Sequence, residues 1–242
     1  MKNLTLFVLL LLSANHVVEA QKITQESLKQ SSLTKHKKVV TQALTYSDMV
    51  TAINSMHHIV AAEGENSTYK DSLAIAYFRM GNYTSSHLLS KELLTKKPTD
   101  VGLLEINAVS LQQLGAAKEA IAAYETLFAQ TKNMYHGYQL ATIQLGIKRL
   151  AEAQAVISQA INCEEIENAA LPFPVGENQN QNVPLKAAAY NLQGLIAFQL
   201  KDFENAKLSF NEALKIEPKF ALAAKNAKDI ATEIEKQAKA KN

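Results

Sequence analysis

The chain has 242 residues and a formal net charge of +2, and 47% of its residues are hydrophobic. This hydrophobic content excludes a wholly disordered chain. The near balance of charges argues against a nucleic-acid-binding protein, which would usually carry a basic stripe. Eight Gly, five Pro and no Trp favour helices over a β-sandwich, which needs more turn and β-branched residues. The single cysteine, Cys163, excludes an internal disulfide.

The first 20 residues have the pattern of a cleavable export signal. Lys2 gives a positive start, residues 4–12 are an almost unbroken apolar run, and the Val-Glu-Ala sequence ending at Ala20 resembles a cleavage site. The apolar run is shorter than the roughly 20 residues that a membrane-spanning helix needs, which favours a cleaved signal. The alternative is that the segment stays uncleaved and acts as a membrane anchor. We therefore expect residues 1–20 to be removed, so that the exported protein begins at Gln21. After this processing it would have no integral membrane span. The Lys2-Asn3 start and the junction between Ala20 and Gln21 favour the periplasm of a Gram-negative bacterium. An extracellular location is the alternative.

The next two segments lead into the main domain. Residues 21–44 are polar and rich in Lys, which predicts a linker or a frayed helix. Residues 45–66 open with a Thr-Tyr-Ser-Asp sequence that resembles a capping box. Met49, Ile53 and Met56 then recur at helical spacing. We interpret residues 45–66 as a single helix that caps the N-terminal end of the domain.

A pattern of about 34 residues recurs in the rest of the chain and is clearest at residues 187–220. Counting from residue 187 as position 1, Gly194 is at position 8, Ala206 at position 20 and Pro218 at position 32. Small residues allow two helices to approach closely, and Pro218 cannot continue a helix. Position 20 is filled in successive repeats by Ser86, Ala120, Ala153 and Ala206, which are 34, 33 and 53 residues apart.

This pattern resembles the tetratricopeptide repeat, with Gln193 as the clearest departure because Leu is usual at position 7. The resemblance implies an all-α fold, a right-handed α-solenoid of antiparallel helix pairs with helical caps. The expected repeat domain spans residues 67–242. Its repeats lie near residues 67–100, 101–133, 134–167 and 187–220.

Residues 168–186 are extra residues between the last two repeats. They contain Pro172, Pro174, Pro184 and a run of alternating Asn and Gln, which predicts a long loop and not a helix. The loop is either a flexible insert or a contact loop with Phe173 near its tip.

Residues 219–240 form the C-terminal segment. Phe220, Ile230 and Ile234 follow one another at helical spacing, and charged residues cover the other side. This pattern predicts a helix that caps the end of the stack of repeats.

Residue patterns typical of catalysis are absent from the sequence. It has no phosphate-binding glycine loop, no His-Glu-x-x-His motif and no Gly-x-Ser-x-Gly elbow. The adjacent His57 and His58 would point in different directions on a helix, so they cannot chelate one ion by themselves. Cys163 lacks a recognisable base partner. We therefore expect no enzymatic activity, no cofactor and no metal site.

The resemblance also implies where a partner would bind. In the family, the first helix of each repeat lines an inner groove through positions 2, 5, 9 and 12, and Glu105 takes position 5 of the second repeat. The basic side chains that hold a C-terminal carboxylate in some relatives are replaced here, for example by Asp71. Tyr135 and Tyr138 have a second interpretation, which is packing on the preceding repeat. The candidate partner-binding residues are Asp71, Ile75, Phe78, Tyr135, Tyr138, Asn191, Leu195 and Phe198.

The expected function is therefore a non-catalytic protein–protein interaction adaptor of the cell envelope. It would bind a peptide or a partner protein in the concave groove. One alternative is a structural scaffold subunit of an envelope complex that docks by its convex face or its insert loop. A third hypothesis is an accessory subunit that presents substrate to an enzyme. Substitutions in the groove distinguish the first hypothesis from the second.

Overall fold

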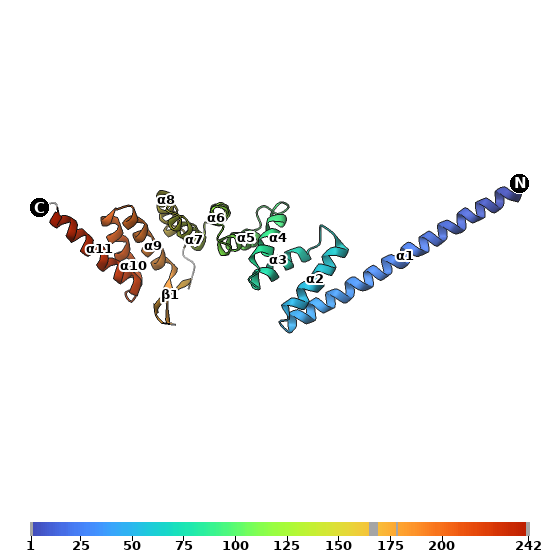
Figure 1. The fold of residues 1–242 in the computed structure, drawn as a ribbon, viewed down its shortest axis with the longest axis horizontal. Coiled ribbons are helices and arrows are strands. Elements are labelled where there is room, and N and C mark those ends of the chain that lie inside the picture. Colours follow the sequence, from blue (N-terminus) through green and yellow to red (C-terminus); the bar gives the residue numbers. More distant parts are fainter. Residues whose placement is uncertain (1, 165–168, 178, 241–242) are drawn as a thin grey trace. The chain divides into compact units, whose positions relative to one another are not determined.

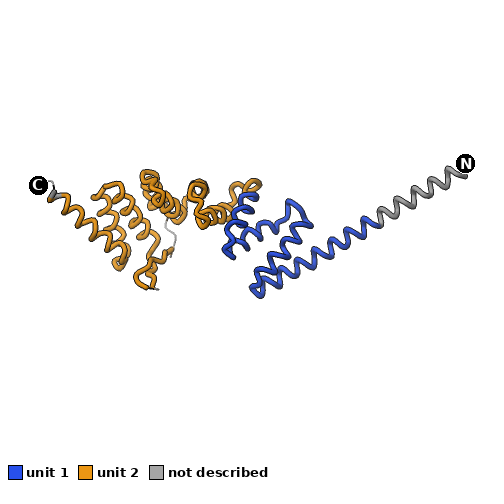
Figure 2. The backbone as a smooth tube through the Cα atoms, viewed as in Figure 1, with its two compact units in different colours: residues 1–93 blue, residues 94–242 orange. Residues whose placement is uncertain are grey.

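A computed structural model describes residues 2–164, 169–177 and 179–240, with the backbone alone for residues 2–20, 238 and 240. Figure 1 shows its helices and its single hairpin in chain order. The chain divides into two compact units, Met1–Leu93 and Leu94–Asn242 (Figure 2). The helices of the first unit are α1 (Lys2–Thr45), α2 (Met49–Glu63), α3 (Tyr69–Arg79) and α4 (Tyr83–Leu94). The second unit contains α5 (Val101–Gln113), α6 (Ala117–Thr131), α7 (Met134–Gly146), α8 (Leu150–Ile161), β1 (Ala170–Gly176), β2 (Gln179–Pro184), α9 (Leu185–Gln199), α10 (Phe203–Ile216) and α11 (Ala221–Ala240).

Both units are built from antiparallel helix pairs, so the expected all-α solenoid is confirmed. The small residues of the repeat frame lie where the paired helices meet. Ser86, Ala120, Ala153 and Ala206 are all 0% exposed. In the first unit the Ser86 hydroxyl donates to the carbonyl of Ala74 on the partner helix at 3.1 Å. The frame deduced from spacing therefore corresponds to the packing of the helices.

Glycine is required at one of these contacts by the lack of space. A Cβ atom added to Gly194 on α9 would lie 2.5 Å from Cε1 of Phe210 on α10. Gly194 therefore allows the Phe210 ring to lie directly against the α9 backbone.

The segment before the predicted domain differs from the expectation. Residues 21–44 belong to α1, and its C-terminal part packs against α2 through Leu33, Val40 and Ala43, which are buried. The interpretation of residues 21–44 as a linker or frayed helix is therefore wrong for this part. The expectation that residues 45–66 form an isolated capping helix is also wrong, because α2 pairs with α1. The N-cap of α2 is Asp48, whose carboxylate accepts the Thr51 N–H at 3.0 Å.

This first pair has the geometry of a further repeat. Ala52 on α2 is 0% exposed and lies 34 residues before Ser86, so it takes position 20 of an upstream frame. The turns inside all the pairs agree with this register. The residue at position 15 has a left-handed backbone each time, with φ of 57° at Ser47, 73° at Gly81, 71° at Gly115, 62° at Lys148 and 62° at Lys201.

The insert is a β-hairpin and not the expected loop, although its first residue, Asn168, lies outside the described residues. Strands β1 and β2 pair antiparallel, with Leu171 opposite Val183 and Phe173 opposite Gln181. In such a ladder, alternate residues of a strand direct their N–H groups away from the partner strand. At such an outward-facing position on an edge strand, Pro172 would remove no hydrogen bond between the strands, although it has no N–H to donate. The sequence analysis treated the prolines as breakers of any regular structure, and this is why it missed the strands.

The hairpin is fixed to the end of the second unit. Phe173 packs edge-on against Phe220, with ring centroids 4.9 Å apart, and Phe220 is 0% exposed. Gln181 donates its amide N–H to the Lys219 carbonyl at 2.8 Å and accepts the Ala221 N–H at 3.2 Å. Phe173 is thus partly buried inside the unit and is not an exposed tip for contacts with a partner.

Candidate functional site

The first candidate site is a pocket of about 540 Å³ between α1, α2 and α3, here called the α1–α3 pocket. Its lining includes Leu44, Met49, Met56 and Ile75, and Arg79 is the charged residue among the described residues that line it. Leu44 and Ile75 are 45% and 41% exposed, so apolar surface remains open to a ligand. A cleft of this size that is mostly apolar, with a few polar groups at its border, is typical of sites that bind side chains or small molecules.

Ile75 is the predicted groove residue of the first unit that lines this pocket. Asp71 is half-buried in the first turn of α3, and Phe78 packs edge-on against Tyr83, with ring centroids 5.9 Å apart. The sequence analysis missed Leu44, Met49 and Met56 as site residues. The upstream frame around Ala52 was the signal that could have found Leu44, because it places Leu44 at position 12.

The second candidate site is a pocket of about 380 Å³ in the second unit, here called the Glu105 pocket. It is lined by Val101 and Glu105 on α5, Tyr135 and His136 on α7, Leu171 on β1 and Leu185 on α9. Tyr135 is a predicted site residue, whereas His136 was not noticed in the sequence. The hairpin supplies one wall, so this pocket depends on the insert.

His136 lines the Glu105 pocket and is 5% exposed. Its Nδ1 atom is 2.9 Å from the Thr131 hydroxyl, and its Nε2 atom is 3.9 Å from the Glu105 carboxylate. Burial lowers the pKa of His136 below its usual value, and the nearby Glu105 carboxylate opposes this effect. Burial therefore favours the neutral imidazole over the charged imidazolium.

The predicted groove is closed at Asn191 on α9. Asn191 is 2% exposed, and its side-chain oxygen accepts a hydrogen bond at 2.9 Å from Asn226 on α11. The prediction that Asn191 lines an open groove is therefore wrong, because α11 covers this face of the last repeat. Leu195 is partly buried and packs against the cluster around Phe210, whereas Phe198 is 42% exposed.

Tyr138 is a packing residue in the interior of the second unit. It is partly buried and contacts two hydrophobic clusters, one within the α5–α9 repeats and one that includes the hairpin residue Val183. Burial raises the pKa of its hydroxyl, so Tyr138 stays neutral. Replacing Tyr138 would disturb the junction of the hairpin with the repeats, so it is a poor probe of binding.

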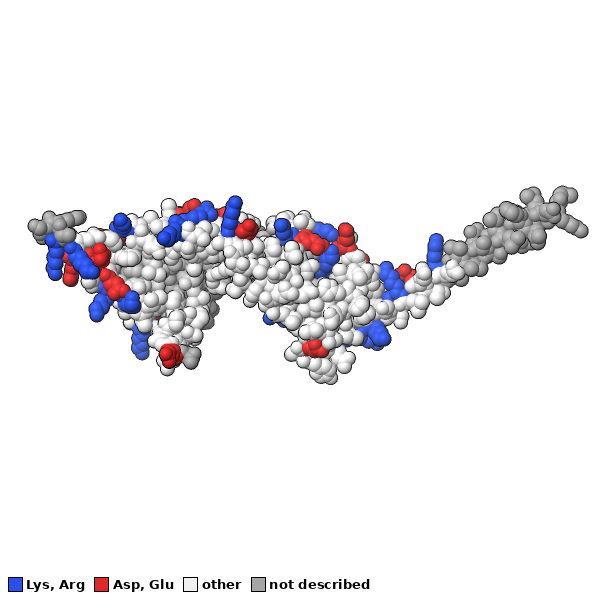
Figure 3. All heavy atoms as spheres, in the orientation of Figure 1, with Lys and Arg blue, Asp and Glu red and all other residues white. Residues whose placement is uncertain are grey.

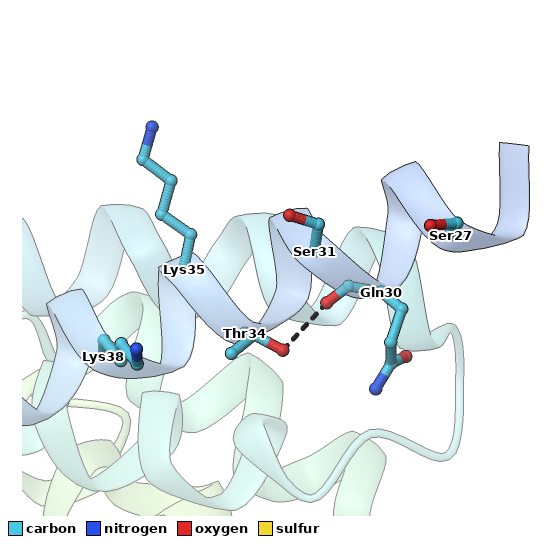
Figure 4. A pocket seen from close by; sticks show the side chains of 6 residues that line it. All are labelled: Ser27, Gln30, Ser31, Thr34, Lys35 and Lys38. Carbon is cyan, nitrogen blue, oxygen red and sulfur yellow. Dashed lines mark hydrogen bonds between the residues drawn. The ribbon is translucent and has the colours of Figure 1, made fainter. Parts of the chain in front are cut away.

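A depression of about 520 Å³ on α1 is a weaker candidate. Figure 4 shows its six side chains, which all come from this one helix, with Lys35 and Gln30 pointing in different directions. The Thr34 hydroxyl donates to the Gln30 carbonyl of the same helix at 2.9 Å. Since a single helix lines it, no second element encloses a ligand there.

Charge does not single out a further site on the face that Figure 3 shows. Basic and acidic side chains are interspersed there, with uncharged surface between them. Within the described ranges, no three or more His, Cys, Asp or Glu side chains gather in a way that could hold a metal ion. Over the same ranges, no helix has the length and apolar character that crossing a membrane requires.

Antiparallel helix pairs that stack through small residues at a fixed register define a helical-repeat protein of the α-solenoid class. Residues 187–220 match the family model of the tetratricopeptide repeat. Residues 187–220 thus match one tetratricopeptide repeat, and the remaining helix pairs share the fold of proteins built from such repeats. A comparison with curated protein sequences gives no match. Tetratricopeptide repeats are generally non-catalytic modules that bind proteins or peptides.

Several solved structures share the fold. The MamA protein is 17% identical, with a TM-score of 0.61 over 78% of this chain and 94% of its own. A tetratricopeptide repeat protein from Parabacteroides merdae is 15% identical, with a TM-score of 0.61 over 87% of this chain and 76% of its own. YrrB, a tetratricopeptide-repeat protein with an unusual peptide-binding site, is 15% identical, with a TM-score of 0.60 over 78% of this chain and 88% of its own.

Proposed function

We propose that the protein is a non-catalytic adaptor that binds an apolar segment of a partner protein in the α1–α3 pocket. The observation that carries this proposal is the half-exposed pair Leu44 and Ile75 at the mouth of an apolar pocket. These side chains lie on first helices of adjacent pairs, which is the face that family members use for partners. Binding would remove their remaining apolar surface from water, and each Å² so buried stabilises a complex by roughly 25 cal/mol.

A structural scaffold that docks by its convex face remains the alternative function. Leu88 on α4 is 60% exposed and lies on the second helix of its pair, so it serves as a probe of that face. The hairpin, which was one alternative docking element, is a weak candidate because Phe173 is packed against Phe220.

Selection of binding peptides tests the adaptor proposal. A displayed library of random peptides is selected on the wild-type protein, and the enriched peptides are titrated against Ile75→Asp and against Leu88→Asp as the matched control. We expect Ile75→Asp to weaken binding by about thirtyfold or more, since truncating or charging a hot spot costs about 2 kcal/mol. Leu88→Asp should bind like the wild type. Both sites are exposed, so circular dichroism should report unchanged helix content for both variants.

The opposite pattern of binding would contradict the proposal that the partner binds in the α1–α3 pocket. Binding that survives Ile75→Asp and is lost in Leu88→Asp would move the contact to the convex face and favour the scaffold. A library that yields no peptide with apolar side chains would also contradict the proposal.

We further propose that the adaptor works in the cell envelope after removal of residues 1–20. Support comes from the sequence alone: the Lys2 start, the apolar run of residues 4–12 and the small residue Ala20. The mature protein, purified from an envelope fraction, should have the intact mass of a chain that begins at Gln21. Retention of Met1 in a membrane fraction would instead show an uncleaved anchor.

A further inference from the structure

Two side-chain groups that can accept hydrogen bonds, on His136 and Glu105, lie close together in the Glu105 pocket. The Thr131 hydroxyl donates its one proton to the Leu127 carbonyl at 2.8 Å. With the hydroxyl proton placed there, we assign the 2.9 Å contact with His136 as a hydrogen bond that Nδ1–H donates to the hydroxyl oxygen. In a neutral imidazole the other nitrogen, Nε2, is then an acceptor. The Glu105 carboxylate is the charged group that lies near Nε2.

Two acceptors thus face one another in this pocket. Nε2 of His136 and Oε1 of Glu105 are 3.9 Å apart, which is too long for a direct hydrogen bond. The Glu105 side chain is 49% exposed, and the residues that line the pocket include neither Lys nor Arg within the described part of the chain. A nitrogen with several N–H groups fits between the two atoms at ordinary hydrogen-bond distances of about 2.9 Å.

The walls of the pocket suit the rest of a basic side chain. Val101, Leu171 and Leu185 are aliphatic and would pack against a chain of methylene groups. The Tyr135 ring lines the same space, and an aromatic ring attracts a cation that lies over its face. The volume of about 380 Å³ is enough for one long side chain.

We propose that the Glu105 pocket binds the side chain of a Lys or Arg residue of the partner, with Glu105 and His136 accepting its N–H groups. This proposal rests on the proposed adaptor function only for the origin of the side chain. Leu171 belongs to β1 and is held opposite Val183, so the insert builds a selectivity pocket that the repeats alone would not have.

Titration with small probes tests the pocket by itself. N-acetyl-lysine amide and N-acetyl-arginine amide are added to the full-length protein, with N-acetyl-norleucine amide as the uncharged control and N-acetyl-glutamate amide as the anionic one. The ¹⁵N resonances of the His136 ring, assigned through His136→Gln, report binding. Concentrations on the order of 10 mM fill most sites of a ligand with a Kd near 1 mM.

We expect the two basic probes to shift the Nε2 resonance and the norleucine and glutamate probes to leave it in place. Glu105→Gln keeps the shape of the side chain and should weaken the basic probes by at least tenfold. Ile75→Asp should not change this response, so failure here is distinct from failure of the peptide-binding groove. An equal response to norleucine, a response to glutamate alone, or no response to any probe would each overturn the proposal.

Discussion

Replacing Ala206 by Phe should lower the free energy of unfolding of the second unit by about 1–3 kcal/mol, because a ring must enter a core that has no space for it. Ala206 is 0% exposed and belongs to a cluster with Ala197, Phe210 and Ile230. The same helix crossing already requires glycine at Gly194, so neither helix can move away without losing the Phe210 contact. Urea denaturation followed by circular dichroism measures the change.

Two control variants check the assignment of the register. Ala206→Ser should be nearly neutral, because Ser86 fills the equivalent position in the first unit and donates to the Ala74 carbonyl. The carbonyl of Gly194 is the corresponding acceptor. Lys228→Ala on the exposed side of α11 should change the stability by no more than about 0.5 kcal/mol. An Ala206→Phe variant that unfolds like the wild type would show that the repeat frame is wrong.

The largest loss of stability is expected from Phe220→Ala. Phe220 is 0% exposed and joins the hairpin, α9 and α11 in one hydrophobic cluster, with its ring against Phe173. Removing a buried Phe side chain costs about 3–5 kcal/mol, from lost transfer free energy and from the cavity that remains. Since domains are stable by only about 5–15 kcal/mol, this variant should show a large fall in the urea midpoint.

Phe198→Ala is the matched control for this prediction. Phe198 lies on α9 in the same unit but is 42% exposed, so truncating it opens no enclosed cavity. The same denaturation experiment should therefore give a much smaller change. Equal losses for the two variants would contradict the view that Phe220 anchors the end of the unit.

The sequence predicted the register of the repeats because that register depends on side-chain size. Ala120, Ala153 and Ala206 recur where helices touch, and only small residues fit there, so their spacing carries the geometry. The α1–α2 pair was missed because it lacks the residues that usually mark the turn and the helix contact of a repeat. Its turn has Ser47 in the left-handed conformation where later repeats have glycine or lysine, and position 8 holds Val40 in place of a smaller residue.

The hairpin could not be deduced with the rules that identified the helices. Pro172 and Pro174 normally indicate a break in structure, and the Asn and Gln residues that pair with this strand are polar. What stabilises the hairpin lies far away in the sequence: Phe220 packs on Phe173, and the Lys219 carbonyl binds Gln181. Such tertiary contacts outweigh local preferences, and a single sequence does not show them.

The candidate sites were predicted only in part, for a similar reason. Ile75 and Tyr135, which were assigned to the groove by their repeat positions, line the α1–α3 pocket and the Glu105 pocket, respectively. The same rule failed at Asn191, because α11 covers the last repeat. The acceptor pair of Glu105 and His136 depends on a hydroxyl that is already committed to Leu127, and no spacing rule reveals this.

The way Gln181 holds the turn after α10 bears on how the chain folds. Its bond to Ala221 links residues only 40 apart in the sequence, and its bond to Lys219 links residues 38 apart. The entropy lost in closing a loop grows slowly with its length, so closing loops of this size costs little more than closing those between adjacent helices. These bonds give the last repeat contacts in addition to its stacking on neighbouring helices. Fraying from the C-terminal end would have to break those contacts first, whereas an end repeat held only by stacking opens alone.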